Sequence, residues 1–183
     1  MNKYIRAMFV VPCGLLKVGW TKLFHPKAFH GTVFCMISPF SEMTINYGGK
    51  LFVGHGFKMR DGAKLRVRKN GKCSIANEVA IGSNCMIVCY DKIAIGSNTQ
   101  LAPNVQIYDH DHDFRAKGGL AAMRFKTSAV EIGSNVWIGA NAVILRGTKI
   151  GDNCVVGAGS VLKGEYPANS VIVQKRETTV VQY

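Results

Sequence analysis

The chain has 183 residues, of which 48% are hydrophobic and 19% charged. This composition excludes a disordered protein and suffices for one domain with a core. The 23 basic and 11 acidic residues give a net charge of +12, which favours anionic partners without choosing among nucleic acid, membranes, acidic polymers and phosphate-bearing cofactors. The six cysteines form no CxxC pair and no Cys/His ligand spacing, so we expect no structural zinc.

Residues 1–30 form a basic and apolar segment. Residues 1–41 contain no acid but five cations, interleaved with large apolar side chains such as Leu16 and Trp20; the cations are Lys3, Arg6, Lys17, Lys22 and Lys27. Two interpretations stay open: a cap on one end of the fold, or an amphipathic anchor on a membrane surface. No apolar run of about 18 residues occurs, so we expect no spanning helix.

A six-residue repeat dominates the second half of the chain. From residue 132 an aliphatic side chain returns every six positions, mostly followed by glycine, at Ile132, Ile138, Ile144, Ile150, Val156 and Leu162. Small side chains recur four places after the first five of them, and Tyr166 occupies that place after Leu162. Neither a helical nor a simple strand period fits this spacing, whereas a repeated hexapeptide does.

The same repeat occurs upstream in sets of three, which begin at Val53, Ile75 and Ile95. Extra residues fall only between sets, and nineteen of them separate Ile107 from Ile132. Insertions at every third hexapeptide indicate triangular coils whose insertions leave at one corner. We therefore predict an all-β solenoid over residues 31–167 with a protruding loop at 108–130. Short caps are expected at residues 1–30 and, as a strand, at 168–183.

The run IGSNVWIGANAVILRGTKIGDNCVVGAGSVL resembles the hexapeptide-repeat acyltransferases, especially the maltose, galactoside and capsular-polysaccharide O-acetyltransferases. The resemblance covers roughly residues 45–172. It implies a left-handed parallel β-helix, an exception to the usual right-handed crossover, and a homotrimer. It also implies transfer of an acetyl group from acetyl-CoA to a hydroxyl of a sugar or glycan, as in polysaccharide modification, with histidine as general base.

The long insertion opens with three acids and two imidazoles within residues 109–113. Histidine suits removal of a proton from an attacking hydroxyl near neutral pH. When residues are counted without a gap from the APNV run at 102–105, the resemblance to the maltose and galactoside enzymes places the catalytic histidine on His112. The DHxH pattern of capsular-polysaccharide relatives makes His110 the second candidate. Asp109, Asp111 and Tyr90 are candidates for binding the acceptor.

The resemblance further predicts pantetheine in a groove between subunits, beside Ala140 and Ala158 and with Trp137 at the thioester end. Cations suit the phosphates of CoA, and the candidates toward the correct end are Arg146, Lys163, Lys175 and Arg176. After Ser170 the chain departs from the family, because the usual Gly-x-Pro is absent.

Three other functions remain open from the sequence. The same base serves N-acetylation of an amino sugar or a drug. A metal hydratase like the γ-carbonic anhydrases shares the fold, but the histidine spacing here does not match its ligands, so we expect no metal. A non-catalytic β-helix is the third. We expect the acceptor to be a glycan, either free or linked to a lipid, and we expect no nucleic-acid partner. We also expect a cytoplasmic protein, with the inner face of the membrane as one location that stays open.

Overall fold

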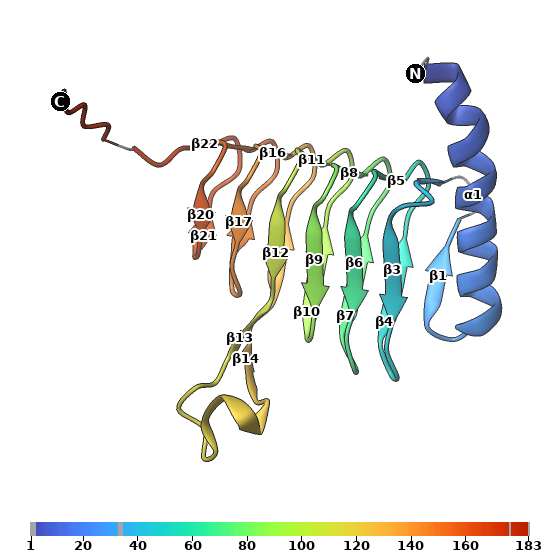
Figure 1. The fold of residues 1–183 in the computed structure, drawn as a ribbon, viewed down its shortest axis with the longest axis horizontal. Helices are drawn as coiled ribbons and strands as arrows, with labels where there is room; N and C mark the ends of the chain where they lie inside the picture. The colour runs from blue at the N-terminus through green and yellow to red at the C-terminus, as the bar shows by residue number, and fades with distance from the viewer. Residues whose placement is uncertain (1–2, 33–34, 176, 183) are drawn as a thin grey trace.

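The computed structural model describes residues 3–32, 35–175 and 177–182. Figure 1 shows stacked coils in a row, with helix α1 (Lys3–Phe24) across one end and a loop projecting from one edge. Each coil adds one strand to each of three parallel sheets, here called A, B and C. The predicted all-β fold, a left-handed β-helix of triangular coils, is confirmed.

Sheets A and B each have seven strands and sheet C has six. Sheet A consists of β1 (Phe29–Gly31), β4 (Lys50–Val53), β7 (Lys72–Ile75), β10 (Lys92–Ile95), β15 (Val130–Ile132), β18 (Lys149–Ile150) and β21 (Glu165–Tyr166). Sheet B consists of β2 (Met36–Ile37), β5 (Lys58–Met59), β8 (Ala80–Ile81), β11 (Gln100–Leu101), β16 (Trp137–Ile138), β19 (Val155–Val156) and β22 (Val171–Ile172). Sheet C consists of β3 (Glu42–Ile45), β6 (Lys64–Val67), β9 (Met86–Cys89), β12 (Gln106–Tyr108), β17 (Val143–Ile144) and β20 (Val161–Leu162).

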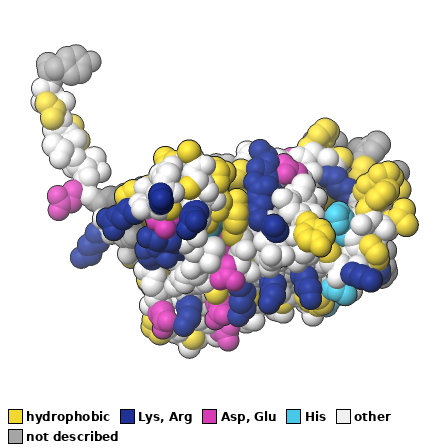
Figure 2. Space-filling view, turned by 90° about the horizontal axis from the view of Figure 1, so that it is seen from below, with side chains coloured by type: hydrophobic (Ala, Val, Ile, Leu, Met, Phe, Trp, Pro, Cys, Tyr) yellow, Lys and Arg dark blue, Asp and Glu magenta, His cyan; other side chains and the backbone are white. Residues whose placement is uncertain are grey.

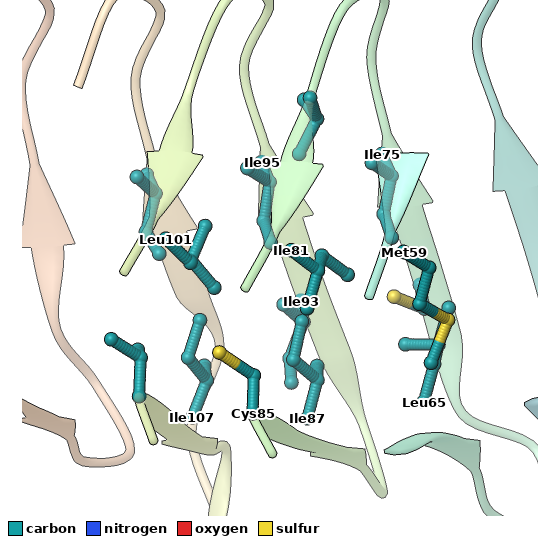
Figure 3. Close-up of a cluster of buried hydrophobic side chains, with 14 of the residues drawn as sticks. Met59, Leu65, Ile75, Ile81, Cys85, Ile87, Ile93, Ile95, Leu101 and Ile107 are labelled. Carbon is teal, nitrogen blue, oxygen red and sulfur yellow. The ribbon is translucent and has the colours of Figure 1, made fainter. Parts of the chain in front are cut away.

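The aliphatic positions of the repeat fill the interior of the solenoid. Ile75, Ile81 and Ile87 belong to one coil, one in each sheet, and each is fully buried or nearly so. Figure 3 shows these side chains pointing inward, stacked on their counterparts in the neighbouring coils. The register confirms the stacking, because Ile81 pairs with Leu101 and Ile87 pairs with Ile107. Burial of this continuous core is what holds neighbouring coils together.

The glycines of the repeat allow neighbouring coils to stack closely, and the turns fall on another residue. Gly139 has no positive φ, but a Cβ there would lie 2.6 Å from the backbone nitrogen of Ala158 in the next coil. The left-handed backbone falls two residues later, on Asn141, with φ of 60°. Glycine is therefore required for close stacking of the coils, and asparagine, which tolerates φ > 0, makes the turn.

Helix α1 covers the end of the first coils. Over residues 10–24, where burial is described, its buried positions are Gly14 and Val18, one turn apart on one face. A Cβ on Gly14 would lie 2.7 Å from the carbonyl oxygen of Cys35, so the helix lies directly on the coil. The Nζ of Lys17 donates to the carbonyl oxygens of Ser38 and Pro39 at 2.9 and 3.0 Å. Within the described residues, no helix combines the length and apolar character needed to cross a bilayer.

The paired strands of the solenoid run from Phe29 to Ile172. Sheet A begins with Phe29, and the last paired strand is β22, which extends sheet B to Ile172. The segment predicted as a capping strand, 168–183, contains this two-residue strand, and its remaining described residues follow without regular pairing.

Candidate active site

The long insertion leaves at the corner between sheets C and A, here called the CA corner. It forms a hairpin of β13 (His110–His112) and β14 (Phe125–Thr127), with a short 3-10 helix, η1 (Gly119–Ala122), at its tip. The corners between sheets A and B and between B and C, the AB and BC corners, consist of short turns. The hairpin is thus the large projection from an otherwise regular prism (Figure 1).

Asp109 anchors the base of this hairpin. Its side chain is fully buried, and its carboxylate accepts hydrogen bonds from the backbone nitrogens of Tyr90 at 2.9 Å and Asp91 at 2.7 Å. Burial alone would raise the pKa of Asp109, but these bonds and the bond from His110 outweigh it and hold the pKa below its usual range. Asp109 therefore stays ionised in the interior.

His110 is the imidazole that Asp109 holds in place. Its Nδ1 lies 3.2 Å from Oδ1 of Asp109, and its side chain is only 13% exposed. The ring lies between aromatic neighbours, with centroid distances of 4.2 Å to Tyr90, 5.8 Å to Tyr108 and 5.5 Å to Phe125. Because an ionised carboxylate accepts from Nδ1–H, Nε2 is left without a proton in the neutral ring.

His112, the first candidate for the base, is less enclosed than His110. Its side chain is exposed, and its ring contacts Phe125 at a centroid distance of 4.6 Å. Asp111, between the two histidines, is exposed and forms an ion pair with Nε of Arg146. The structure therefore brings Asp109, His110 and Tyr90 together, and it leaves His112 and Asp111 at the rim.

Trp137 borders a groove on another part of the prism. Its side chain is 57% exposed and adjoins two shallow hollows of about 320 and 340 Å³. The larger hollow also includes residues of the BC corner, namely Gly82, Ser83, Ala102 and Pro103. Ala140 and Ala158 continue that corner on the following coils, where the backbone nitrogen of Gly159 donates to the carbonyl of Ala140 at 2.7 Å. Small residues thus form a continuous edge that an extended pantetheine chain can follow.

The cations expected to meet the CoA phosphates do not gather at this groove. Arg146 lies at the CA corner, bound to Asp111, and Lys163 lies exposed at the same corner. Lys175 follows Gln174, whose amide group bonds to both backbone groups of Val161, just after the BC corner. Arg176 lies outside the described residues. Among the described candidates, Lys175 alone follows a residue that is bonded beside the BC corner.

The base and the groove of one chain occupy different edges of the prism. His110 lies at the CA corner, whereas Trp137 is on sheet B and Ala140 is at the BC corner. In the described part of the chain, no group of three or more His, Cys, Asp or Glu side chains could hold a metal ion.

Sequence reasoning missed Phe125, whose ring lies 4.4 Å from that of Tyr90 and also contacts both histidines. Only the hairpin register, which pairs His112 with Phe125, brings it there. No periodicity within the insertion marked it.

Comparison with known proteins agrees with this fold. A family described as bacterial transferase hexapeptide (six repeats) matches residues 129–164. The putative lipopolysaccharide biosynthesis O-acetyl transferase WbbJ of Escherichia coli is 34% identical over 136 residues, 70% of this chain and 69% of the relative. Galactoside O-acetyltransferase of Escherichia coli is 38% identical over 92 residues, but the match spans only 43% of that protein.

Solved structures show the same architecture. AntD, an N-acyltransferase from Bacillus cereus in complex with dTDP and 3-hydroxybutyryl-CoA, has a TM-score of 0.68 at 20% identity, covering 85% of this chain and 83% of AntD. A galactoside acetyltransferase in complex with coenzyme A has a TM-score of 0.52 at 21% identity, covering 91% of this chain and 78% of that chain. At such identities the likeness concerns the fold.

The solenoid and its hexapeptide spacing define a hexapeptide-repeat transferase. The similarity to WbbJ extends over two thirds of both chains, and the chain therefore belongs to the hexapeptide-repeat acyltransferase family. The predicted class, an acyl-CoA-dependent acetyltransferase, is confirmed by this membership.

Proposed function

We propose that this protein transfers an acetyl group from acetyl-CoA to a hydroxyl of a sugar or glycan of the cell-surface polysaccharide type. The observation that carries the proposal is the buried Asp109 carboxylate, which orients His110 at the base of the projecting hairpin. The similarity to WbbJ, named as a putative lipopolysaccharide biosynthesis O-acetyl transferase, supports a glycan hydroxyl as acceptor.

The geometry favours His110 over His112 as the general base. Asp109 accepts the Nδ1 proton, so Nε2 of His110 can take the proton of the acceptor hydroxyl as the oxygen attacks the thioester carbonyl. The tetrahedral intermediate then collapses with release of the CoA thiolate, which the imidazolium can protonate. Cys89, behind Asp109, is no nucleophile, because Cys73, burial and the charge of Asp109 raise the pKa of its thiol.

His110→Ala and His112→Ala test this assignment. We expect His110→Ala to lower kcat at least about a hundredfold, the usual minimum for loss of a general base, and His112→Ala to lower it far less. Thiol release from acetyl-CoA would be followed with a panel of sugar acceptors. A larger loss in His112→Ala than in His110→Ala would refute the assignment. A midpoint shift of thermal unfolding on addition of CoA would report donor binding without any acceptor.

We propose a homotrimer, because one chain alone does not bring His110 to the groove beside Trp137. Association of solenoids side by side can place the CA corner of one subunit against the groove of the next. Co-expression of His110→Ala with Trp137→Ala would then regain activity, since some interfaces combine an intact base with an intact groove. If each chain carried its own complete site, mixing would restore nothing.

N-acetylation is the second candidate. AntD is named as an N-acyltransferase, and the same histidine base would serve an amine. Matched hydroxyl and amino sugars as acceptors would separate the two reactions, and higher kcat/KM for the amine would replace the first proposal.

We further propose that α1 rests on an anionic membrane surface at the cytoplasmic face. Outside the contact through Gly14 and Val18, α1 exposes Leu16, Trp20 and Leu23 to 73%, 68% and 71%. Leu16 and Trp20 also line a hollow beside the start of β3. Exposed apolar patches of this kind mark contact surfaces. A second copy would bring like charges together, because residues 1–41 contain no acid. An anionic lipid surface complements both properties.

Sedimentation with vesicles tests this contact. We expect the protein to bind phosphatidylcholine vesicles that contain phosphatidylglycerol, and added salt to weaken the binding. Leu16→Glu/Trp20→Glu would abolish it, and the control Val180→Glu/Val181→Glu, at exposed apolar positions beyond the solenoid, would retain it. No binding of the unchanged protein, or a change of oligomeric state in the Leu16→Glu/Trp20→Glu variant, would show that lipid is not the partner.

A further inference from the structure

Arg68 carries an unused hydrogen-bonding group beside the proposed base. Its Nε is enclosed by protein and has no hydrogen-bond acceptor among the described residues. Its guanidinium carbon lies 5.9 Å from the centre of the Tyr90 ring, which in turn contacts His110. Arg66, two residues earlier, shows the contrasting case, because Glu42 holds its guanidinium through two bonds of 2.7 and 2.8 Å. Buried polar groups are normally satisfied, and an enclosed Nε is out of reach of a ligand. Arg68 as a whole is only half-buried, however, and has no carboxylate partner among the described residues, so its charge is available to an anion from outside.

Lysines extend this positive charge along the same corner. Lys50, Lys72 and Lys92 begin β4, β7 and β10 and are direct partners in the parallel register. Adjacent strands lie about 4.8 Å apart, and like charges directly opposite one another destabilise a sheet. Glu131 compensates Lys92 at 2.7 Å, but within the described chain Lys50 and Lys72 have no carboxylate partner. Figure 2, which views the molecule from the side of this corner, shows Lys and Arg side chains gathered along it.

Backbone bonds join these cations and the base in one rigid frame. The backbone nitrogen of Arg68 donates to the carbonyl of Cys89 at 2.7 Å, and that of Lys72 donates to Asp91 at 2.8 Å. Tyr90 and Asp91 in turn donate to the carboxylate of Asp109, the partner of His110. The positions of Arg68 and Lys72 relative to the imidazole are therefore fixed by the stacking of three successive coils.

We propose that the acceptor is anionic and that Arg68 binds its carboxylate or phosphate group. The planar fork of an arginine matches both groups in geometry and charge, and one aromatic ring separates it from His110. The charged group therefore belongs to the sugar that receives the acetyl group or to its neighbour. Lys50 and Lys72 attract further negative charge along the chain. This inference rests on the proposed function only in taking His110 as the base.

Calorimetric titration of the full-length protein tests the inference with three probes. These are trigalacturonic acid, which carries carboxylates, glucose 1-phosphate, which carries a phosphate, and neutral maltotriose. We expect at least one anionic probe to bind about tenfold or more tightly than maltotriose, a difference of about 1.4 kcal/mol. Binding of trigalacturonic acid alone identifies a carboxylate, and binding of glucose 1-phosphate alone identifies a phosphate.

Arg68→Gln is expected to lower the affinity for the favoured probe about tenfold or more, the usual effect of losing a charge-assisted hydrogen bond. Arg68→Lys, which retains the charge but not the fork, should retain part of the affinity. Lys149→Gln is the matched control, because it also removes one positive charge but from a lysine paired with Glu165. The affinity of the Lys149→Gln variant for the favoured probe should stay within about twofold of that of the unchanged protein, a far smaller change than the tenfold loss expected for Arg68→Gln.

Three results would overturn the inference: no binding of either anion, equal binding of maltotriose, or equal effects of Arg68→Gln and Lys149→Gln. The shift of the unfolding midpoint with CoA is measured on the same samples. Its persistence in Arg68→Gln would show a folded protein with an intact donor site. If CoA did not shift the unfolding midpoint of the unchanged protein, this would count against the proposed function. The result with the anionic probes would still be interpreted separately.

Discussion

Asp109→Asn is expected to destabilise the protein by about 3 kcal/mol, although it replaces one oxygen by an NH2 group. The fully buried carboxylate accepts from Tyr90, Asp91 and His110, at 2.9, 2.7 and 3.2 Å. The amide of asparagine can accept these bonds only through its single oxygen. Its NH2 group takes the place of the other carboxylate oxygen and points its N–H groups at a group that is itself a donor. The variant thus loses a charge-assisted bond, worth about 1.5–3 kcal/mol, and leaves a buried donor unsatisfied, at about 1–3 kcal/mol.

The same replacement changes how stability depends on pH. The folded-state pKa of Asp109 is held below its usual value by the bonds from His110, Tyr90 and Asp91, which outweigh burial. The resulting stability is fully present above the unfolded-state pKa, near 3.8. It is lost as the pH falls through the lower folded-state pKa. Asp109→Asn should lack this contribution, so its loss of stability relative to the unchanged protein should be largest above that range and smaller below it.

Thermal and urea unfolding measure the effect. For a chain of this length, about 3 kcal/mol corresponds to a drop in Tm of roughly 6–12 °C. Asp113→Asn is the control, because Asp113 lies in the same insertion but pairs with the exposed Lys126 at 3.2 Å, a contact worth about 0–1 kcal/mol. Equal stability of Asp109→Asn and Asp113→Asn would refute the view that Asp109 anchors the hairpin.

Three further predictions follow from the stacking of the coils and from the proposed chemistry. Gly139→Ala should cost about 1–3 kcal/mol in urea unfolding, because its Cβ would meet the backbone of the next coil. Gly19→Ala, in α1 with nothing within 4 Å, should instead stabilise by about 0.5–1 kcal/mol; equal effects would contradict the assigned role of Gly139. Ile87→Ala should cost about 2–5 kcal/mol by opening a cavity in the core, and the half-exposed Val161→Ala far less; a small effect at Ile87 would mean that the coils collapse around the gap. Removal of divalent metals with EDTA should leave acetyl transfer unchanged, and a loss that zinc restores would indicate metal-dependent chemistry.

The donor side was only partly predictable. The resemblance indicated Trp137, Ala140 and Ala158, and the structure places Ala140 and Ala158 on the BC corner, next to the sheet that carries Trp137. The cations that bind the CoA phosphates are harder to predict, because the sequence position of a charged side chain does not reveal its partner. Arg146 was a candidate for phosphate, but the hairpin folds back and supplies Asp111 as its partner.

The sequence by itself determined the solenoid. Burial in a narrow triangular interior requires an aliphatic side chain at each inward position, so the spacing of Ile75, Ile81 and Ile87 already defines the coil. The insertion points followed as well, because extra residues can leave only at a corner without breaking the stacking of the strands. The family resemblance supplied the handedness, which the hexapeptide spacing alone does not specify.

Only the tertiary structure decided which side chains meet at the CA corner. Asp109 reaches the backbone of Tyr90 and Asp91 because coils stack eighteen or nineteen residues apart there. Phe125 reaches both histidines because the hairpin pairs across the insertion. Such contacts join positions that are distant in sequence and depend on register and on backbone bonds. A local pattern could show that residues 109–113 were unusual, but it could not show which imidazole is buried against a carboxylate and which is left exposed.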